Sequence, residues 1–290
     1  MAKIKEKNKA IFFIICSAFC FTIMNACVRL SGDLPFIQKS FFRNFVAAIL
    51  AFAVLKKNHV KITCKPENRI YMFLRAFCGT AGMLCNFYAV DRLVLADASM
   101  LNKMSPFFAV VFSAIILKDK PAPFQVGAVA AAFIGSLFII KPTFANADLF
   151  ASATGFIGGM GAGAAYAFVS KLGRGGEKGP VIVFFFSVFS CVVTIPYIIF
   201  NFVPMSAFQT AMLLLTGLSA AGGQFSITAA YTHAPAKEVS VFDYSQIIFS
   251  AILGFFLFDQ IPDIWSFVGY GIIIAAAVSM FLYNNRKQEN

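Results

Sequence analysis

The stretch ADASMLNKMSPFFAVVFSAIILKDKP, residues 96–121, decides the fold of this chain. It is apolar and has the length of a membrane helix, yet Lys103 and Pro106 lie near its middle. A lysine at the centre of a bilayer costs about 3 kcal/mol on insertion scales. Either this stretch is not a membrane span, or Lys103 has a partner inside the membrane. The rest of the sequence distinguishes the two possibilities.

Composition favours a membrane protein with many spans. The 290 residues are 59% hydrophobic and 13% charged, whereas soluble domains carry about 25% charged residues. The connections between the apolar runs are too short to hold a soluble domain. The sequence has no Walker A motif, no Ser/His/Asp arrangement and no metal-ligand spacing. We therefore expect no enzymatic activity, no cofactor and no metal.

Ten apolar runs predict an all-α membrane protein with ten transmembrane helices, because each has about the 20 residues that a span requires. The runs are residues 10–30, 36–55, 70–90, 96–117, 122–140, 154–173, 181–201, 207–231, 237–258 and 264–283. With the N-terminus inside, 17 of the 24 Lys and Arg residues fall on the inner side, 3 in outer connections and 4 within spans. This bias predicts cytoplasmic N- and C-termini and a multi-pass protein of the inner (cytoplasmic) membrane. The same bias accounts for the net charge of +11, so this charge does not indicate nucleic-acid binding.

The two halves of the chain resemble each other. When the first half is shifted by 140 residues along the sequence, Ala89 aligns with Ala229, Ser105 with Ser245 and Leu117 with Leu257. Each half holds five predicted spans, an odd number, so the second half enters the membrane from the opposite side. Transporters are often built from such inverted repeats, with the site at the repeat interface. We expect two five-helix repeats, residues 1–142 and 143–290.

The same alignment of the halves places Lys103 on Asp243. Each lies about 10 Å inside its predicted span, as estimated from the helical rise per residue, but the two are counted from opposite membrane faces. In a core of about 30 Å they would lie at levels roughly 10 Å apart. A solute or a few waters could then connect them, with Lys103 binding an anionic group and Asp243 a cationic group or a proton. The alternative is a direct pair that locks the bundle.

Other polar residues within the spans extend this candidate site. Asn102 precedes Lys103, and Pro106 leaves the Asn102 carbonyl without a helical partner, so we expect a kink there. The remaining candidate solute-binding residues are Asn25, Arg43, Asn86, Tyr88, Tyr166, Gln224, Tyr244 and Gln246. Taken singly, each is more simply an interhelical hydrogen-bonding group. Arg75 and Lys39 lie nearer to the span ends, and we expect them to extend to the inner and outer interfaces.

Three stretches carry a family resemblance. They are FFRNFVAAILA (41–51), LRAFCGTAGMLCNFYAVDRLVLADASMLNKMSPFFAVVFSAIILKDKP (74–121) and QVGAVAAAFIGSLFIIKP (125–142). Together with ten spans in 290 residues, they resemble the EamA-type transporters of the drug/metabolite transporter superfamily. The resemblance implies movement of small organic solutes by alternating access, with a proton or counter-solute as partner.

We therefore predict a secondary active transporter that moves a small amphoteric metabolite, such as an amino-acid-like solute, by export or exchange. The expected partners are the solute, protons or a counter-solute, and membrane lipids, but no nucleic acid. The chain would act as a monomer or a homodimer. Two alternatives stay open. One is a lipid-linked solute flippase, which needs a lateral opening to lipid, and the other is a structural or sensory membrane protein.

Overall fold

The computed structural model describes residues 2–116, 122–140, 148–233 and 240–289, and these residues are almost entirely helical. Helices suit a chain in lipid because they satisfy every backbone hydrogen bond within one segment. The predicted boundary between residues 142 and 143 lies outside the described residues. The elements are α1 (Ala2–Leu30), α2 (Phe36–Lys57), η1 (Pro66–Asn68), α3 (Arg69–Arg92), α4 (Leu95–Asn102), α5 (Ser105–Ile116), α6 (Pro123–Ile140), α7 (Leu149–Arg174), α8 (Gly179–Asn201), α9 (Ala207–His233), η2 (Ser240–Tyr244), α11 (Ser245–Phe258) and α12 (Ile264–Glu289).

The described helices have the length and apolarity of a multi-pass membrane protein. Seven segments could cross a membrane: Asn8–Leu30, Phe36–Lys57, Pro66–Arg92, Leu95–Ile116, Gly179–Asn201, Ala207–Ile227 and Ile264–Tyr283. Two shorter apolar helices are Pro123–Ile139 and Phe242–Phe258. Large apolar side chains such as Phe200 and Phe256, which are 83% and 75% exposed, cover the outside of the bundle. Such an exterior suits contact with lipid rather than with water.

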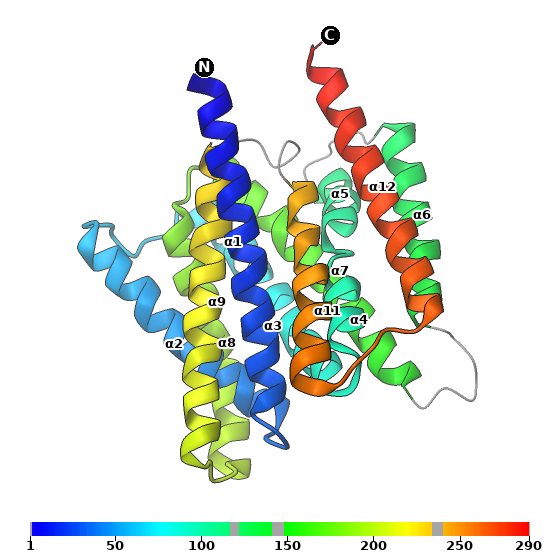
Figure 1. Cartoon of the computed structure of the whole chain (residues 1–290). Helices are drawn as coiled ribbons and strands as arrows, with labels where there is room; N and C mark the ends of the chain where they lie inside the picture. Colours follow the sequence, from blue (N-terminus) through cyan, green and yellow to red (C-terminus); the bar gives the residue numbers. More distant parts are fainter. Residues whose placement is uncertain (1, 117–121, 141–147, 234–239, 290) are drawn as a thin grey trace.

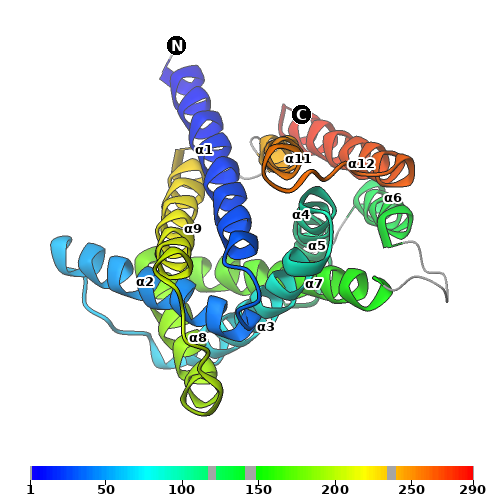
Figure 2. The ribbon, with the colours of Figure 1, turned by 60° about the horizontal axis from the view of Figure 1, so that its bottom comes forward.

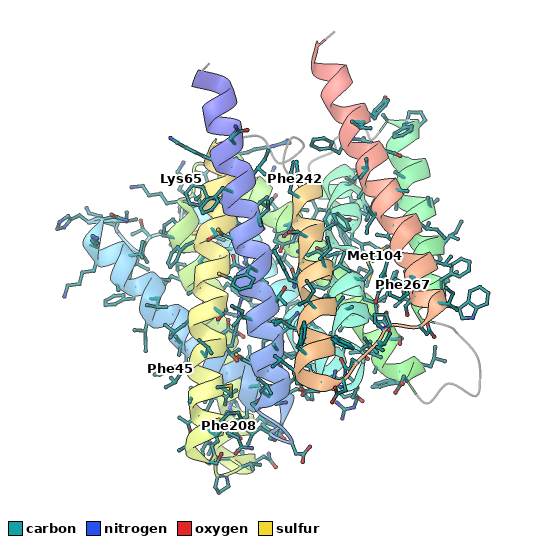
Figure 3. The ribbon with its side chains drawn as sticks, in the orientation of Figure 1. Phe45, Lys65, Met104, Phe208, Phe242 and Phe267 are labelled. Atoms are coloured by element: carbon teal, nitrogen blue, oxygen red, sulfur yellow. The ribbon has the colours of Figure 1, made fainter. Side chains whose placement is uncertain are left out.

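The helices pack in pairs that are distant in sequence. α1 packs along α9 and α3 along α7, while α2 contacts α8 and α6 contacts α12. Figures 1 and 2 show α6 and α12 together at one edge, with α4, α5 and α11 closer to the middle. α1 begins and α12 ends at the same end of the bundle (Figure 1). Lys65 lies toward that end and Phe208 at the opposite one (Figure 3).

The segment that carries Lys103 is interrupted rather than continuous. α4 ends at Asn102 and α5 begins at Ser105, which leaves Lys103 and Met104 between the two helices. Pro106 accounts for the interruption because it has no N–H to donate to the preceding turn. The Phe107 N–H donates to the Met104 carbonyl at 3.1 Å, and the Lys103 carbonyl accepts a hydrogen bond of 3.1 Å from the Tyr244 hydroxyl.

Asp243 also lies at an interruption. It belongs to the 3₁₀ turn η2, which directly precedes α11, rather than to a regular α-helix. Ser99 Oγ on α4 and Ser250 Oγ on α11 lie 2.8 Å apart and share a hydrogen bond, which fixes the two segments side by side. The two interrupted segments therefore face each other across the middle of the bundle.

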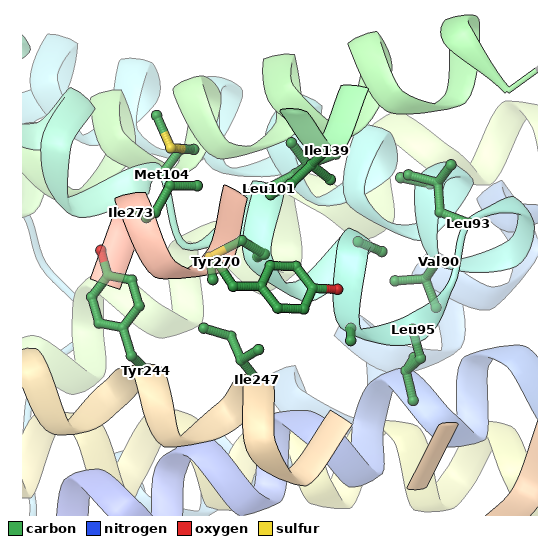
Figure 4. Close-up of a cluster of buried hydrophobic side chains, with 14 of the residues drawn as sticks. Val90, Leu93, Leu95, Leu101, Met104, Ile139, Tyr244, Ile247, Tyr270 and Ile273 are labelled. Carbon is green, nitrogen blue, oxygen red and sulfur yellow. The ribbon is translucent and has the colours of Figure 1, made fainter. Parts of the chain in front are cut away.

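An apolar cluster holds these interrupted segments in place (Figure 4). Leu101 and Met104 pack there with Ile139 of α6, Ile247 of α11 and Ile273 of α12, all of them buried. Lipid removes most of the hydrophobic force between helices, so close van der Waals packing supplies the attraction. In the same cluster the Tyr270 hydroxyl of α12 donates to Asp97 Oδ1 of α4 at 2.6 Å.

Lys39 does not reach the interface as the sequence led us to expect. It is completely buried, and its Nζ donates to Asp91 Oδ1 at 2.6 Å. The bond joins the start of α2 to the end of α3. Lys39 failed to reach the interface because Asp91, 52 positions away in the chain, offered it a closer partner.

We expect Lys39→Met to lower stability by about 2 kcal/mol, because Asp91 then loses its buried partner. The expected loss is smaller than the roughly 3–5 kcal/mol of a fully buried broken pair, since the Asp91 side chain keeps 18% exposure. Thermal melts of purified Lys39→Met, Asp91→Asn and the double variant measure it. The double variant should lose less than the sum of the singles. Strictly additive losses would show that the pair contributes nothing.

Candidate functional site

A cavity of about 110 Å³ lies where the helix interruptions meet α1, α2, α3, α7, α8 and α9. Half of its lining is polar, and the rest is apolar side chains and glycine. The polar residues are Asn25, Arg43, Arg75, Asn86, Asn102, Lys103, Tyr166, Gln224, Asp243 and Gln246. Polar groups that converge on a concave cavity among apolar side chains are typical of small-molecule sites.

Lys103 and Asp243 form a direct salt bridge in this cavity. Lys103 Nζ lies 2.5 Å from Asp243 Oδ2, and the two residues are only 5% and 8% exposed. The expected separation of about 10 Å is therefore wrong. It assumed continuous helices with a constant rise per residue, whereas both residues lie at helix interruptions.

The second carboxylate oxygen of Asp243 takes no part in the salt bridge with Lys103. Among the described residues, Asp243 Oδ1 is buried and accepts no hydrogen bond. A carboxylate oxygen has capacity for more than one hydrogen bond. It can therefore accept one from a solute ammonium group, from water or from a proton on the carboxyl itself.

Arg75 enters the cavity, contrary to the expectation that it extends to the inner interface. It is 6% exposed, and its Cζ lies 4.0 Å from the ring centroid of Phe186 on α8. Its Nη1 approaches Gly79, one turn further along α3, where a Cβ would lie 2.5 Å away. The side chain thus extends deeper into the bundle. A glycine four residues after a deep arginine is the sequence signal that could have identified it.

Arg43 faces the same ring from α2. Its Cζ lies 5.5 Å from the Phe186 centroid, and its Nη1 donates to Asn44 Oδ1 at 2.6 Å. Asn44 in turn donates to Ser190 Oγ on α8 at 2.8 Å. This chain of contacts holds the Arg43 guanidinium at the cavity wall.

Most of the other predicted residues also line the cavity, namely Asn25, Asn86, Asn102, Tyr166, Gln224 and Gln246. Tyr166 is 41% exposed and contributes to the cavity lining from α7. No group of three or more His, Cys, Asp or Glu side chains that could hold a metal occurs in the described ranges.

Two predicted residues lie elsewhere. Tyr88 packs its ring against Phe36 and Phe150 at centroid distances of 5.5 and 5.6 Å, with the Arg92 guanidinium 3.8 Å above it. Its aromatic neighbours, which periodicity does not reveal, hold it away from the cavity. Tyr244 does not line the cavity either, and its hydroxyl supports the Lys103 carbonyl instead.

Comparison with known proteins finds a matching family model and similarity to two named relatives. Residues 8–141 match the model of the EamA-like transporter family. The chain is 28% identical to the pseudopaline exporter CntI of Pseudomonas aeruginosa, covering 94% of this chain and 96% of that one. It is 25% identical to human solute carrier family 35 member G1, covering 92% of this chain and 77% of the relative.

A solved crystal structure shares the fold. It superposes with a TM-score of 0.65 at 15% sequence identity, covering 96% of this chain and 98% of that chain. At that identity the likeness concerns the fold alone.

Proposed function

We propose that this chain, whose residues 8–141 match the EamA-like transporter family, is a secondary active transporter whose cavity binds a small solute and opens alternately to the two membrane faces. The observation that carries the proposal is the salt bridge between Lys103 and Asp243, which lies at two helix interruptions beside a polar cavity. Charged groups inside a membrane protein are costly and generally mark the path of a solute or ion. Interrupted helices at a site are the usual architecture of secondary transporters.

The packing supports two inverted repeats, each of five spans. When the halves are aligned so that Lys103 meets Asp243, α1 corresponds to α7 and α3 to α9, so the α1–α9 and α3–α7 contacts exchange with each other. The α2–α8 and α6–α12 contacts each map onto themselves. An even number of spans, ten, fits the position of both chain ends at one end of the bundle (Figure 1), which we assign to the cytoplasm.

The Lys103–Asp243 pair links solute binding to a change of state. A solute anion competes with Asp243 for Lys103, and the released carboxylate then takes a solute cation or a proton. Loss of the bridge loosens the contact between the α4–α5 segment and α11, which belong to different halves. The cavity can then open to the other side of the membrane and release the solute. We propose export or exchange as the direction of transport, because one relative is named as an exporter.

A ligand screen followed by flux measurement tests the proposal. Purified protein is melted in the presence of amphoteric and anionic metabolites, and each stabilising solute is then loaded into proteoliposomes. We expect at least one to be transported at a rate that depends on a pH gradient or on a counter-solute. A protein that transports none of the stabilising solutes would contradict the proposal and favour a structural or sensory role.

Two tyrosine variants provide a matched comparison in this assay. Tyr166→Phe removes a hydroxyl from the cavity, so we expect flux to fall about tenfold, the effect of one lost hydrogen bond of roughly 1.4 kcal/mol. Tyr88→Phe removes a hydroxyl outside the cavity and should leave flux unchanged. The opposite ranking would move the solute path away from the cavity.

A further inference from the structure

The charges of the cavity do not balance. Its charged lining consists of Arg43, Arg75, Lys103 and Asp243. Asp243 neutralises Lys103 through the 2.5 Å salt bridge. In the part of the chain that the structure describes, neither Arg43 nor Arg75 forms a salt bridge. Two positive charges are therefore left without a carboxylate.

The two guanidinium groups also keep unused hydrogen-bond donors. Arg43 and Arg75 are 5% and 6% exposed, so both guanidinium groups are shielded from bulk solvent. Among the described residues Arg43 Nε, Arg75 Nε and Arg75 Nη1 have no hydrogen-bond acceptor. Buried charged groups are normally paired and hydrogen-bonded, because an unpaired one is destabilising.

Phe186 places the two cations near each other without neutralising them. Its ring centroid lies 4.0 Å from Arg75 Cζ and 5.5 Å from Arg43 Cζ. A ring face attracts a cation but carries no net charge. A Cβ at position 79 would lie 2.5 Å from Arg75 Nη1 and 3.1 Å from the Phe186 ring, so Gly79 leaves the space that this arrangement requires.

We propose that Arg43 and Arg75 form a clamp for a dianionic oxyanion, and that the transported solute carries a net charge of about −2. Planar guanidinium groups match carboxylate and phosphate oxygens in bidentate geometry. Two carboxylates or one phosphate monoester supply the required charge. The inference rests on the proposed function for its link to transport, and it revises the expected amphoteric solute toward a net anion.

The clamp makes a prediction that needs no knowledge of the solute. Arg75→Met removes an unpaired buried charge, so the melting temperature of the ligand-free protein should stay the same or rise. Arg43→Met should behave in the same way. Lys39→Met, which breaks a paired buried cation, is the matched control and should lower it. Arginine variants that melt as early as Lys39→Met would overturn the clamp, because they would show a structural role.

Isosteric probes test the charge preference directly. Succinate, succinamate and succinamide have nearly the same size and net charges of −2, −1 and 0, and glycerol 3-phosphate supplies a phosphate. We expect succinate or glycerol 3-phosphate to bind at least about tenfold more tightly than succinamate in thermal-shift titrations. In Arg75→Met this difference in affinity should disappear. The stronger of the two dianions identifies the oxyanion type. Equal binding of the three succinyl probes, or no binding of either dianion, would overturn the clamp.

The proposed clamp and the proposed transport function can be refuted independently of each other. Flux of a neutral or cationic solute that survives Arg75→Met would refute the clamp and leave the transporter standing. Dianion binding that requires both arginines, in a protein without flux of any bound solute, would refute transport and leave the clamp standing.

Discussion

Asp243→Asn is expected to lower solute flux at least about 100-fold, a loss of roughly 2.7 kcal/mol. Asn keeps the shape of the side chain but carries no charge, so Lys103 remains buried with no counter-charge and no proton-accepting carboxylate. Lys103→Ala should have an effect of similar size, because it leaves Asp243 unpaired. Flux of the solute identified by screening, in proteoliposomes with matched protein content, measures both. Unchanged flux in both variants would remove the pair from the mechanism.

A double variant separates a role in transport from a role in folding. Each single substitution breaks a buried pair and should also lower stability by about 3–5 kcal/mol. Lys103→Met combined with Asp243→Leu replaces both charges with apolar groups, which is often neutral or stabilising. We therefore expect the double variant to regain stability but not flux. If it regained both, the pair would only lock the fold, which is the role expected of a structural or sensory protein.

Gly82→Val is expected to lower stability by about 3 kcal/mol, because it forces α3 and α7 apart. A Cβ at Gly82 would lie 2.9 Å from both the Ala162 nitrogen and the Gly158 carbonyl oxygen. These neighbours are backbone atoms and cannot move aside as a side chain can. Small residues commonly allow such close backbone approach in membrane helices. Melting of the purified variant measures the loss.

Gly127→Val is the matched control for that experiment. Gly127 lies on α6, and no atom lies within 4 Å of its hypothetical Cβ. We expect a change below about 0.5 kcal/mol, as for exposed substitutions away from structural features. Similar losses in both variants would attribute the effect to valine itself rather than to contact between α3 and α7.

The pairing of Lys103 with Asp243 shows what the sequence can predict. Apolar run length placed both residues in membrane segments, and the alignment of the two halves placed Lys103 opposite Asp243. Their contact distance could not be predicted, because residue counting assumes regular helices. Pro106 indicated one interruption, whereas no proline or glycine lies in η2 to indicate the other.

Arg75, Lys39 and Tyr88 show why side-chain direction was harder to predict. Depth along a helix suggested that Arg75 and Lys39 reach the interfaces, but the direction of each depended on neighbours far away in the chain. Phe186 on α8 attracts Arg75, and Asp91 on α3 binds Lys39. Tyr88 lies on the same helix as the cavity residue Asn86, two positions away and therefore on a different face. Such choices depend on which helices become neighbours, and periodicity alone does not specify that.

Access to the cavity from each side of the membrane distinguishes an alternating-access transporter from a static bundle. Ala162 lines the cavity from α7, and Ala162→Cys can be placed in a protein whose seven native cysteines are replaced. Charged, membrane-impermeant thiol reagents are then applied to right-side-out and inside-out vesicles. Ile157→Cys, on the same helix at a position that is 50% exposed on the outside of the bundle, serves as the control. Alternating access predicts that Cys at 162 is labelled from both sides and Cys at 157 from neither. Labelling of position 162 from one side only would contradict a cavity that opens alternately.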